Sequence, residues 1–154
     1  MVRLSEIIRE ENVICDLKAK DKRGVLEELA EAVSRNEEAV NKTALVKVLV
    51  ERERLGSTGI GDGVAIPHGK LSGVSYPIMS FGRSRQGLNF DAMDGQPVYL
   101  FFLLVAPENS SGIHLQALAK IAKMLKNSVF RKRLMKAKDR RGLYQEIVHS
   151  DEAL

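Results

Sequence analysis

The feature that most constrains the fold of this chain is the run PVYLFFLLV at residues 97–105. Its residues are apolar almost without interruption, whereas a strand with one face in water alternates apolar and polar residues. A continuous apolar run is typical of a strand that is buried on both faces. We therefore expect residues 97–105 at the centre of a β-sheet.

Helical spacing of apolar residues recurs on both sides of that run. Before it we expect a short helix at 4–8, a strand at 13–17, a helix from its cap Asp21 to Asn36 and a helix at 41–55 that ends at Gly56. Between that helix and the run we expect strands at 64–66, 76–82 and 88–90. After the run we expect helices at 112–126, 129–137 and 140–150, with Ser128 and Asp139 as N-caps. The pattern predicts one compact α/β domain over residues 1–154, with a mixed sheet flanked by helices on both faces.

Composition fits one ordinary globular domain, with 44% apolar and 29% charged residues. The start of the chain is too charged for a signal peptide, and no run of eighteen apolar residues exists, so we expect a cytoplasmic protein without membrane insertion. The single cysteine, Cys15, excludes an internal disulfide and lies in an apolar run, where we expect a small buried side chain.

Positive charge is unevenly distributed along the chain. The net charge is +4, and between Lys120 and Arg141 ten Lys or Arg accompany only Asp139. This stretch lacks interleaved aromatic residues, zinc-ligand spacing and a helix-turn-helix pattern, which disfavours nucleic acid as the partner. A solvated face, or contact with a protein or phosphate-bearing partner, remains open.

A loop with five glycines, GSTGIGDGVAIPHGK, spans residues 56–70. We expect it to be irregular except at 64–66. The Walker A pattern fails because Lys70 is followed by leucine, and the Rossmann pattern fails because the glycines read GxGxG after a helix. A nucleotide cofactor is therefore not expected.

Within this loop, His68 stands between Pro67 and Gly69. Proline stiffens the approach to the imidazole, and glycine lets another part of the chain come close. This arrangement predicts an exposed, rigidly held histidine. A histidine without function at the tip of a loop would have the same local sequence. The interpretation therefore depends on which other residues lie near His68.

The helix before the loop carries Arg52. Leu45, Val48 and Leu49 define an apolar stripe that extends to Arg52, which predicts a guanidinium on the inward face. Such a group needs an anion. The alternative to a bound anion is an ion pair between Arg52 and the carboxylate of Asp62 or Glu53.

A second histidine, His114, shares a helical face with Leu118, Ile121 and Leu125 and also points inward. It lies in the first turn of its helix, where the helix dipole favours an anion. An ordinary core histidine is the alternative. His149 is better explained by the C-terminal end of the last helix.

Together, His68, His114, Arg52, the hydroxyls of Ser57 and Thr58 and the backbone N–H groups of the glycines suit a phosphoryl group. Phosphoryl transfer mainly requires positioning and neutralisation of charge on the phosphoryl oxygens, which arginine does well. The 46-residue separation of the two histidines and the nearby arginine disfavour a metal site.

The segment LVERERLGSTGIGDGVAIPHGK, followed later by HLQAL, resembles the enzyme IIA domains of the fructose and mannitol type in the bacterial phosphotransferase system. The resemblance covers nearly the whole chain and is closest to the nitrogen-regulatory enzyme IIA branch. It implies a compact domain with a mixed sheet between helices. The chain would then be a phosphotransferase component and not a free-standing metabolic enzyme.

The same resemblance implies roles for individual residues. His68 would be phosphorylated through Nε2, Arg52 and His114 would stabilise the phosphoryl group, and Ser57, Thr58 and Gly69 would support it. The donor would be an HPr-like or nitrogen-related HPr phosphocarrier. Phosphorylation would then regulate target proteins, such as potassium transport or sensor components.

The alternative is a sugar-specific enzyme IIA that passes phosphate to an enzyme IIB for fructose- or mannitol-type uptake. We expect a free-standing chain without attached IIB or IIC segments, which favours regulation.

Overall fold

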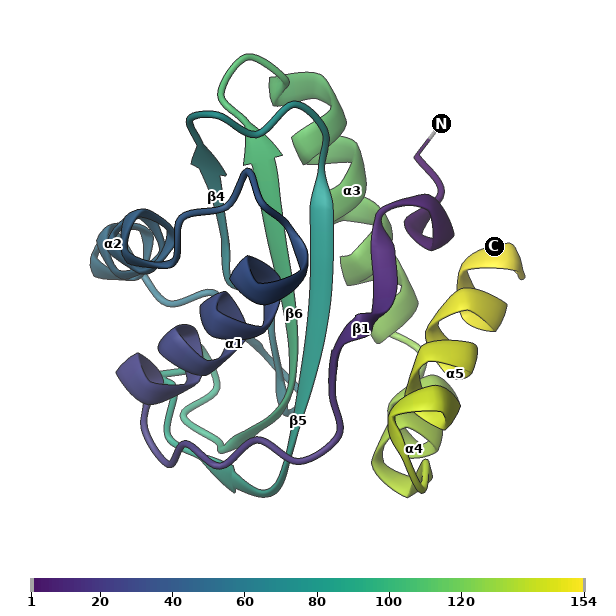
Figure 1. Ribbon diagram of the computed structural model, residues 1–154. Coiled ribbons are helices and arrows are strands. Elements are labelled where there is room, and N and C mark those ends of the chain that lie inside the picture. The colour runs from purple at the N-terminus through teal and green to yellow at the C-terminus, as the bar shows by residue number, and fades with distance from the viewer. Residues whose placement is uncertain (1, 154) are drawn as a thin grey trace.

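A six-stranded mixed sheet forms the middle layer of the structure, a computed structural model that describes residues 2–153 (Figure 1). Its strands are β1 (Ile8–Ile14), β2 (Gly59–Gly61), β3 (Val64–Ala65), β4 (His68–Leu71), β5 (Ile78–Leu88) and β6 (Val98–Pro107). The strand order is β1-β5-β6-β3-β2, and β4 also pairs with β6. Strand β6 is antiparallel to β5 and parallel to β3 and β4, so the predicted central strand is confirmed.

Helices cover both faces of this sheet. One face is covered by α1 (Lys22–Asn36) and α2 (Lys42–Arg54), and the other by α3 (Ser111–Leu125), α4 (Ser128–Lys136) and α5 (Arg140–Glu152) (Figure 1). Side chains of β6 alternate between the two resulting cores: Phe101, Leu103 and Val105 pack toward α1 and α2, while Phe102 and Leu104 pack toward α3, α4 and α5. The predicted α/β fold is confirmed. Within residues 2–153, no helix has the length and apolar character needed to cross a membrane.

Short polar side chains start most of these helices. Asp21, Asn41 and Asp139 each accept a hydrogen bond from a backbone N–H of the first turn of α1, α2 and α5. Helix α4 begins at Ser128, and its cap is Asn127, whose side chain accepts from two backbone N–H groups. Asp21 and Asp139 are therefore the predicted caps, whereas Ser128 is not.

The predicted helix at residues 4–8 is wrong. A single 3-10 turn, η1 (Leu4–Glu6), leads directly into β1. Local apolar spacing fits a helix, but Ile8 pairs with Met79 in a parallel ladder, and tertiary pairing prevails over local preference. The strand predicted at 13–17 accordingly begins earlier and ends at Ile14.

The strands predicted at 76–82 and 88–90 are one strand, β5. The polar residues between them include Arg83, whose side chain is fully buried. Its guanidinium donates to the carbonyls of Cys15 (3.1 Å), Leu134 (2.8 Å) and Ala137 (2.6 Å) and so satisfies the end of α4. Cys15 itself is half-buried, less than predicted.

Candidate functional site

One segment of chain lies along the free edge of β6 and carries His68. Val64 of β3 pairs with Leu100, and His68 of β4 pairs with Leu104. Between the two strands lies Pro67, which has no N–H for the ladder. The loop predicted at 56–70 is thus more regular than expected, because β2, β3 and the start of β4 fall within it.

The imidazole of His68 is held by its own backbone neighbour. Its Nδ1 lies 2.8 Å from the carbonyl oxygen of Ile66. Because a carbonyl oxygen only accepts, Nδ1 carries the proton in the neutral ring and Nε2 keeps its lone pair. The ring is half-buried rather than exposed as predicted, and this burial is the main cause that lowers its pKa; the charge of Arg52 lowers it further. The residue therefore presents a neutral nucleophilic Nε2 near pH 7.

His114 lies in the first turn of α3 and faces His68, as predicted. The ring centroids are 5.3 Å apart, with 54° between the ring planes. The side chain is buried, and within residues 2–153 its Nδ1 has no hydrogen-bond partner. Burial lowers the pKa of His114, and the charges of His68 and Lys70 lower it further. Two imidazoles that favour the neutral form therefore meet at the start of α3.

Lys70 is a residue of this site that the sequence interpretation missed. It lies two positions after His68 on β4, so both side chains point to the α3 side of the sheet. Its Nζ donates to Oγ of Ser111, 2.6 Å away, at the first residue of α3. The two-residue period of a strand was the signal that could have found it.

Arg52 does not lie on the inward face of α2, where the sequence predicted it. The buried residues of this helix are Leu45, Val46, Leu49 and Glu53, so its inward stripe passes through Glu53. Arg52 is half-buried, and its guanidinium donates to the carbonyl of Gly56 over 2.8 Å. It forms no ion pair with Glu53 or Asp62 within the described residues. Because its charge lowers the pKa of His68, it nevertheless belongs to the surroundings of that ring.

The carboxylate of Glu53 organises the turn that follows α2. It accepts from Nζ of Lys22 (3.0 Å), from the backbone N–H of Thr58 (3.1 Å) and from the Thr58 hydroxyl. The residue is only 8% exposed. The sequence indicates Glu53 only as a possible partner of Arg52, whereas in the structure it joins α1, α2 and the start of the glycine-rich segment.

The predicted supporting hydroxyls are engaged with the protein. Ser57 Oγ donates to the carbonyl of Phe90 (2.8 Å), and the Thr58 hydroxyl donates to Glu53. A Cβ on Gly69 would clash with Cγ1 of Val48, so glycine lets α2 pack closely on β4. Phosphate support by Ser57, Thr58 and Gly69 stays a prediction.

Neither His149 nor a metal cluster adds to this site. His149 is exposed on α5, where it was expected near the helix end. Among residues 2–153, no group of three or more His, Cys, Asp or Glu side chains is arranged to hold a metal ion.

Comparison with known proteins assigns this chain to a family. Residues 6–150 match the family model described as "Phosphoenolpyruvate-dependent sugar phosphotransferase system, EIIA 2". The chain belongs to this family. The predicted family is therefore confirmed.

Relatives in the EIIA 2 family include proteins named for nitrogen regulation. The chain is 40% identical over 141 residues to "Nitrogen regulatory protein" of Bradyrhizobium diazoefficiens, covering 92% of each chain. It is 39% identical over 148 residues to the protein of the same name from Pseudomonas aeruginosa, covering 96% of each. The fructose-specific EIIABC component of Bacillus subtilis is 30% identical over 151 residues, and there the chain spans 24% of the relative.

Solved structures of EIIA proteins share the fold. Nitrogen regulatory protein IIA-Ntr from Neisseria meningitidis superposes with a TM-score of 0.87 at 35% identity, covering 94% of this chain and 98% of that one. IIA mannitol from Escherichia coli gives 0.76 at 20% identity, covering 90% and 97%. The predicted likeness to nitrogen-regulatory and mannitol-type enzyme IIA is thereby confirmed at the level of family and fold.

Proposed function

We propose that this chain accepts a phosphoryl group on Nε2 of His68 from an HPr-like or nitrogen-related HPr phosphocarrier. The observation that carries this proposal is the 2.8 Å contact between His68 Nδ1 and the Ile66 carbonyl. It places the lone pair of the neutral ring on Nε2. The lowered pKa of His68 keeps that lone pair available near pH 7.

Transfer exchanges one nitrogen–phosphorus bond for another. Nε2 of His68 attacks phosphorus on the donor phosphohistidine, and the donor nitrogen leaves with the electron pair of the broken bond. The cations Arg52 and Lys70 and the start of α3 supply positive potential for the phosphoryl oxygens. Arg52 would exchange its bond to the Gly56 carbonyl for a bidentate contact with phosphate. His114 would donate a hydrogen bond from its buried ring.

The phosphorylation state would then regulate target proteins, which we expect among potassium transport or sensor components. Relatives at 39% and 40% identity that bear the name "Nitrogen regulatory protein" support this role. The second candidate is transfer to an enzyme IIB. It is favoured by the fructose-specific relative and by the Escherichia coli mannitol IIA, which is solved as a complex with phosphorylated enzyme IIB and shares this fold.

Reconstitution with enzyme I, a phosphocarrier and labelled phosphoenolpyruvate tests the chemistry. We expect an acid-labile, base-stable label on the chain, and none on His68→Ala. A normal amount of label on His68→Ala would refute the proposed function.

A pull-down separates regulation from relay. Wild type, His68→Ala and the charge mimic His68→Asp would be compared as bait. Different partners for His68→Ala and His68→Asp would support regulation. Identical partners that include an enzyme IIB would support the second candidate.

A further inference from the structure

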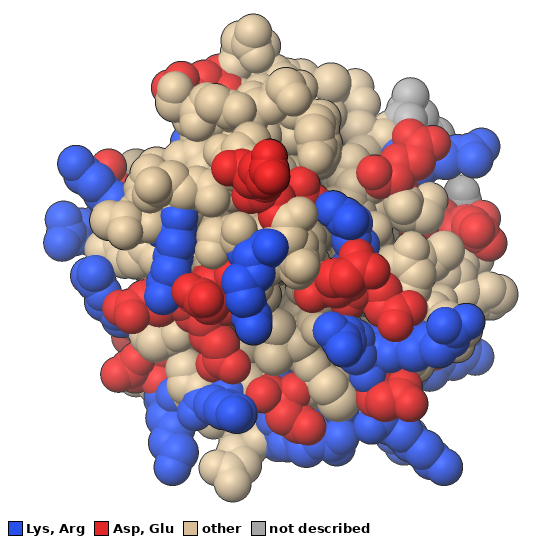
Figure 2. Space-filling model, in the orientation of Figure 1, with Lys and Arg blue, Asp and Glu red and all other residues tan. Residues whose placement is uncertain are grey.

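The cations near the C-terminal end of the chain differ from those elsewhere in their surroundings. Of the ten Lys and Arg between residues 120 and 141, only Lys120 forms an ion pair within residues 2–153, with Asp151 at 2.5 Å. Lys120 is half-buried against α5, and its Nζ also donates to the carbonyl of Val2. The other nine cations have no acidic partner among the described residues. Figure 2 shows Lys and Arg predominating at the lower right, where Figure 1 draws α4 and α5.

A hollow of about 330 Å³, which we call the α4 hollow, lies among these cations. Its apolar lining comes from Tyr99 and Leu100 of β6 and from Met135 of α4. Arg131, Lys132 and Lys136 of α4 line it as well. An apolar depression thus coincides with three cations that lack acidic partners.

The α4 hollow also touches the segment that carries His68. Asp62 and Gly63, in the turn between β2 and β3, line it. Along β6, however, Leu100 at the hollow and Leu104 beside His68 are four residues apart, roughly 13 Å in a strand. An occupant of the hollow would therefore leave His68 accessible while contacting the turn that leads to it.

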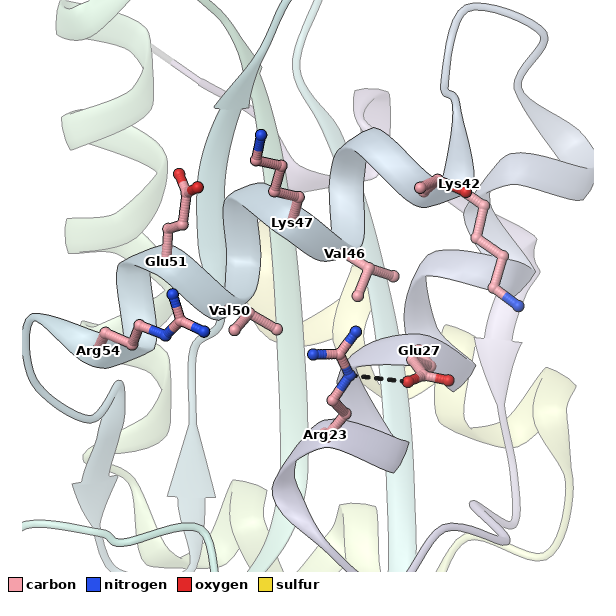
Figure 3. A pocket seen from close by; sticks show the side chains of 9 residues that line it. Arg23, Glu27, Lys42, Val46, Lys47, Val50, Glu51 and Arg54 are labelled. Atoms are coloured by element: carbon pink, nitrogen blue, oxygen red, sulfur yellow. Dashed lines mark hydrogen bonds and ion pairs between the residues drawn. The ribbon is translucent and has the colours of Figure 1, made fainter.

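A larger hollow of about 450 Å³ between α1 and α2 serves as a contrast (Figure 3). Its cationic side chains are accompanied by Glu27 and Glu51, and Arg23 pairs with Glu27 at 3.0 Å. Lys42 pairs with Glu31 at 3.0 Å. Two of the four cations in that lining thus form ion pairs, whereas none of the three cations that line the α4 hollow pairs with an acidic side chain of the described residues, Asp62 included.

We infer that the α4 hollow docks an acidic protein segment that inserts one apolar side chain. Uncompensated cations favour an acidic partner, and a small apolar depression favours a side-chain anchor over a phosphate backbone. A nucleic-acid duplex keeps the faces of its bases stacked inside and presents mainly phosphates, so it has no apolar side group to insert between Tyr99, Leu100 and Met135. A membrane would require exposed apolar side chains, and on α4 and α5 the one large exposed example is Val129.

A synthetic peptide of glutamates around one central leucine tests this surface, by ¹⁵N–¹H NMR titration of the full chain at low salt. We expect chemical-shift changes centred on Gly63, Tyr99, Leu100 and Met135. Lys132→Glu with Lys136→Glu should weaken binding by about tenfold or more, because each reversal turns an attraction into a repulsion. A peptide with alanine in place of leucine should also bind more weakly.

Matched controls make the test specific. Lys20→Glu with Lys47→Glu changes the net charge equally at two exposed positions next to α1 and on α2, and should leave binding of the peptide unchanged. Phosphorylation of His68 should proceed normally in both double variants. Equal peptide binding by the two double variants, or equal binding of the leucine and alanine peptides, would overturn the inference. Tighter binding of a short DNA duplex or of anionic vesicles than of the peptide at this surface would overturn it as well.

Discussion

The imidazole rings of His68 and His114 face each other from β4 and α3, with 5.3 Å between their centroids. His68 has its Nδ1 bonded to Ile66, whereas the buried Nδ1 of His114 has no partner within residues 2–153. A buried polar atom without a partner costs stability whether or not it has a function, so its presence needs an explanation. Under the proposed function, His68 is the fixed nucleophile of this pair and His114 has a ring nitrogen free to bind the phosphoryl group.

Replacing His114 should separate stability from transfer. His114→Leu fills a similar volume without a polar atom, so we expect the free energy of unfolding to rise by about 1 kcal/mol. Phosphoryl transfer should slow by about tenfold or more because a donor to the phosphoryl oxygens is lost. Urea denaturation and the rate of labelling measure the two effects. An unchanged transfer rate would remove His114 from the site.

The lowered pKa values of both histidines predict how stability depends on pH. In the unfolded chain each histidine has a pKa of about 6.5, whereas in the folded chain burial lowers the pKa of each. As pH falls through about 6.5, the unfolded state binds more protons, so stability declines until the folded rings titrate as well. Wild type should lose more stability between about pH 7.5 and pH 5 than His68→Gln with His114→Leu, because that variant lacks both groups. Equal losses in urea denaturation would contradict this.

Arg52 and Arg54 both lie in the last turn of α2, so one can serve as the control for the other. Arg52 acts on the pKa of His68, whereas Arg54 is exposed and lines the hollow between α1 and α2. Arg52→Ala should slow phosphoryl transfer by about tenfold to a hundredfold, as expected for loss of a charge-assisted contact to the phosphoryl group. Arg54→Ala should leave the rate unchanged. Single-turnover labelling with excess phosphocarrier compares them, and equal rates would show that position 52 has no special role.

Glu53 should matter through the turn that it holds. Glu53→Gln keeps the side-chain size but removes the charge that binds Lys22 and Thr58, so we expect the free energy of unfolding to fall by about 2 kcal/mol. Phosphoryl transfer should also slow. Residues 56–58 then lose their contact with Glu53, and the carbonyl of Gly56 that Arg52 contacts is no longer held in place. Glu51→Gln, on the exposed side of the same helix, serves as the control for stability and rate. If both variants behave alike, the contacts of Glu53 are not significant.

Residues 97–105 and the helical stripes sufficed to predict the architecture because burial on both faces of a strand leaves a strong pattern. The errors arose where long-range pairing prevailed over local spacing. Ile8 joins a ladder with β5 although its neighbours are spaced as in a helix, and the buried Arg83 resembles a break between strands because its partners are distant carbonyls.

The site shows the same division. His68 and His114 meet as their local patterns predicted. The sequence did not predict which face of α2 is buried. An apolar stripe that extends to Arg52 and one that extends to Glu53 both fit the helical period, and only packing decides between them. Lys70 was missed because its neighbour, Ser111, comes from a distant helix.

The most direct measurement is the ¹⁵N spectrum of the histidine rings in uniformly labelled protein, before and after phosphorylation by enzyme I and the phosphocarrier. We predict that, before phosphorylation, His68 is the neutral tautomer with its proton on Nδ1, and that phosphorylation changes the Nε2 resonance of His68 to that of a phosphoramidate while Nδ1 stays protonated. Phosphorylation at Nδ1 of His68, or at His114, would contradict the account.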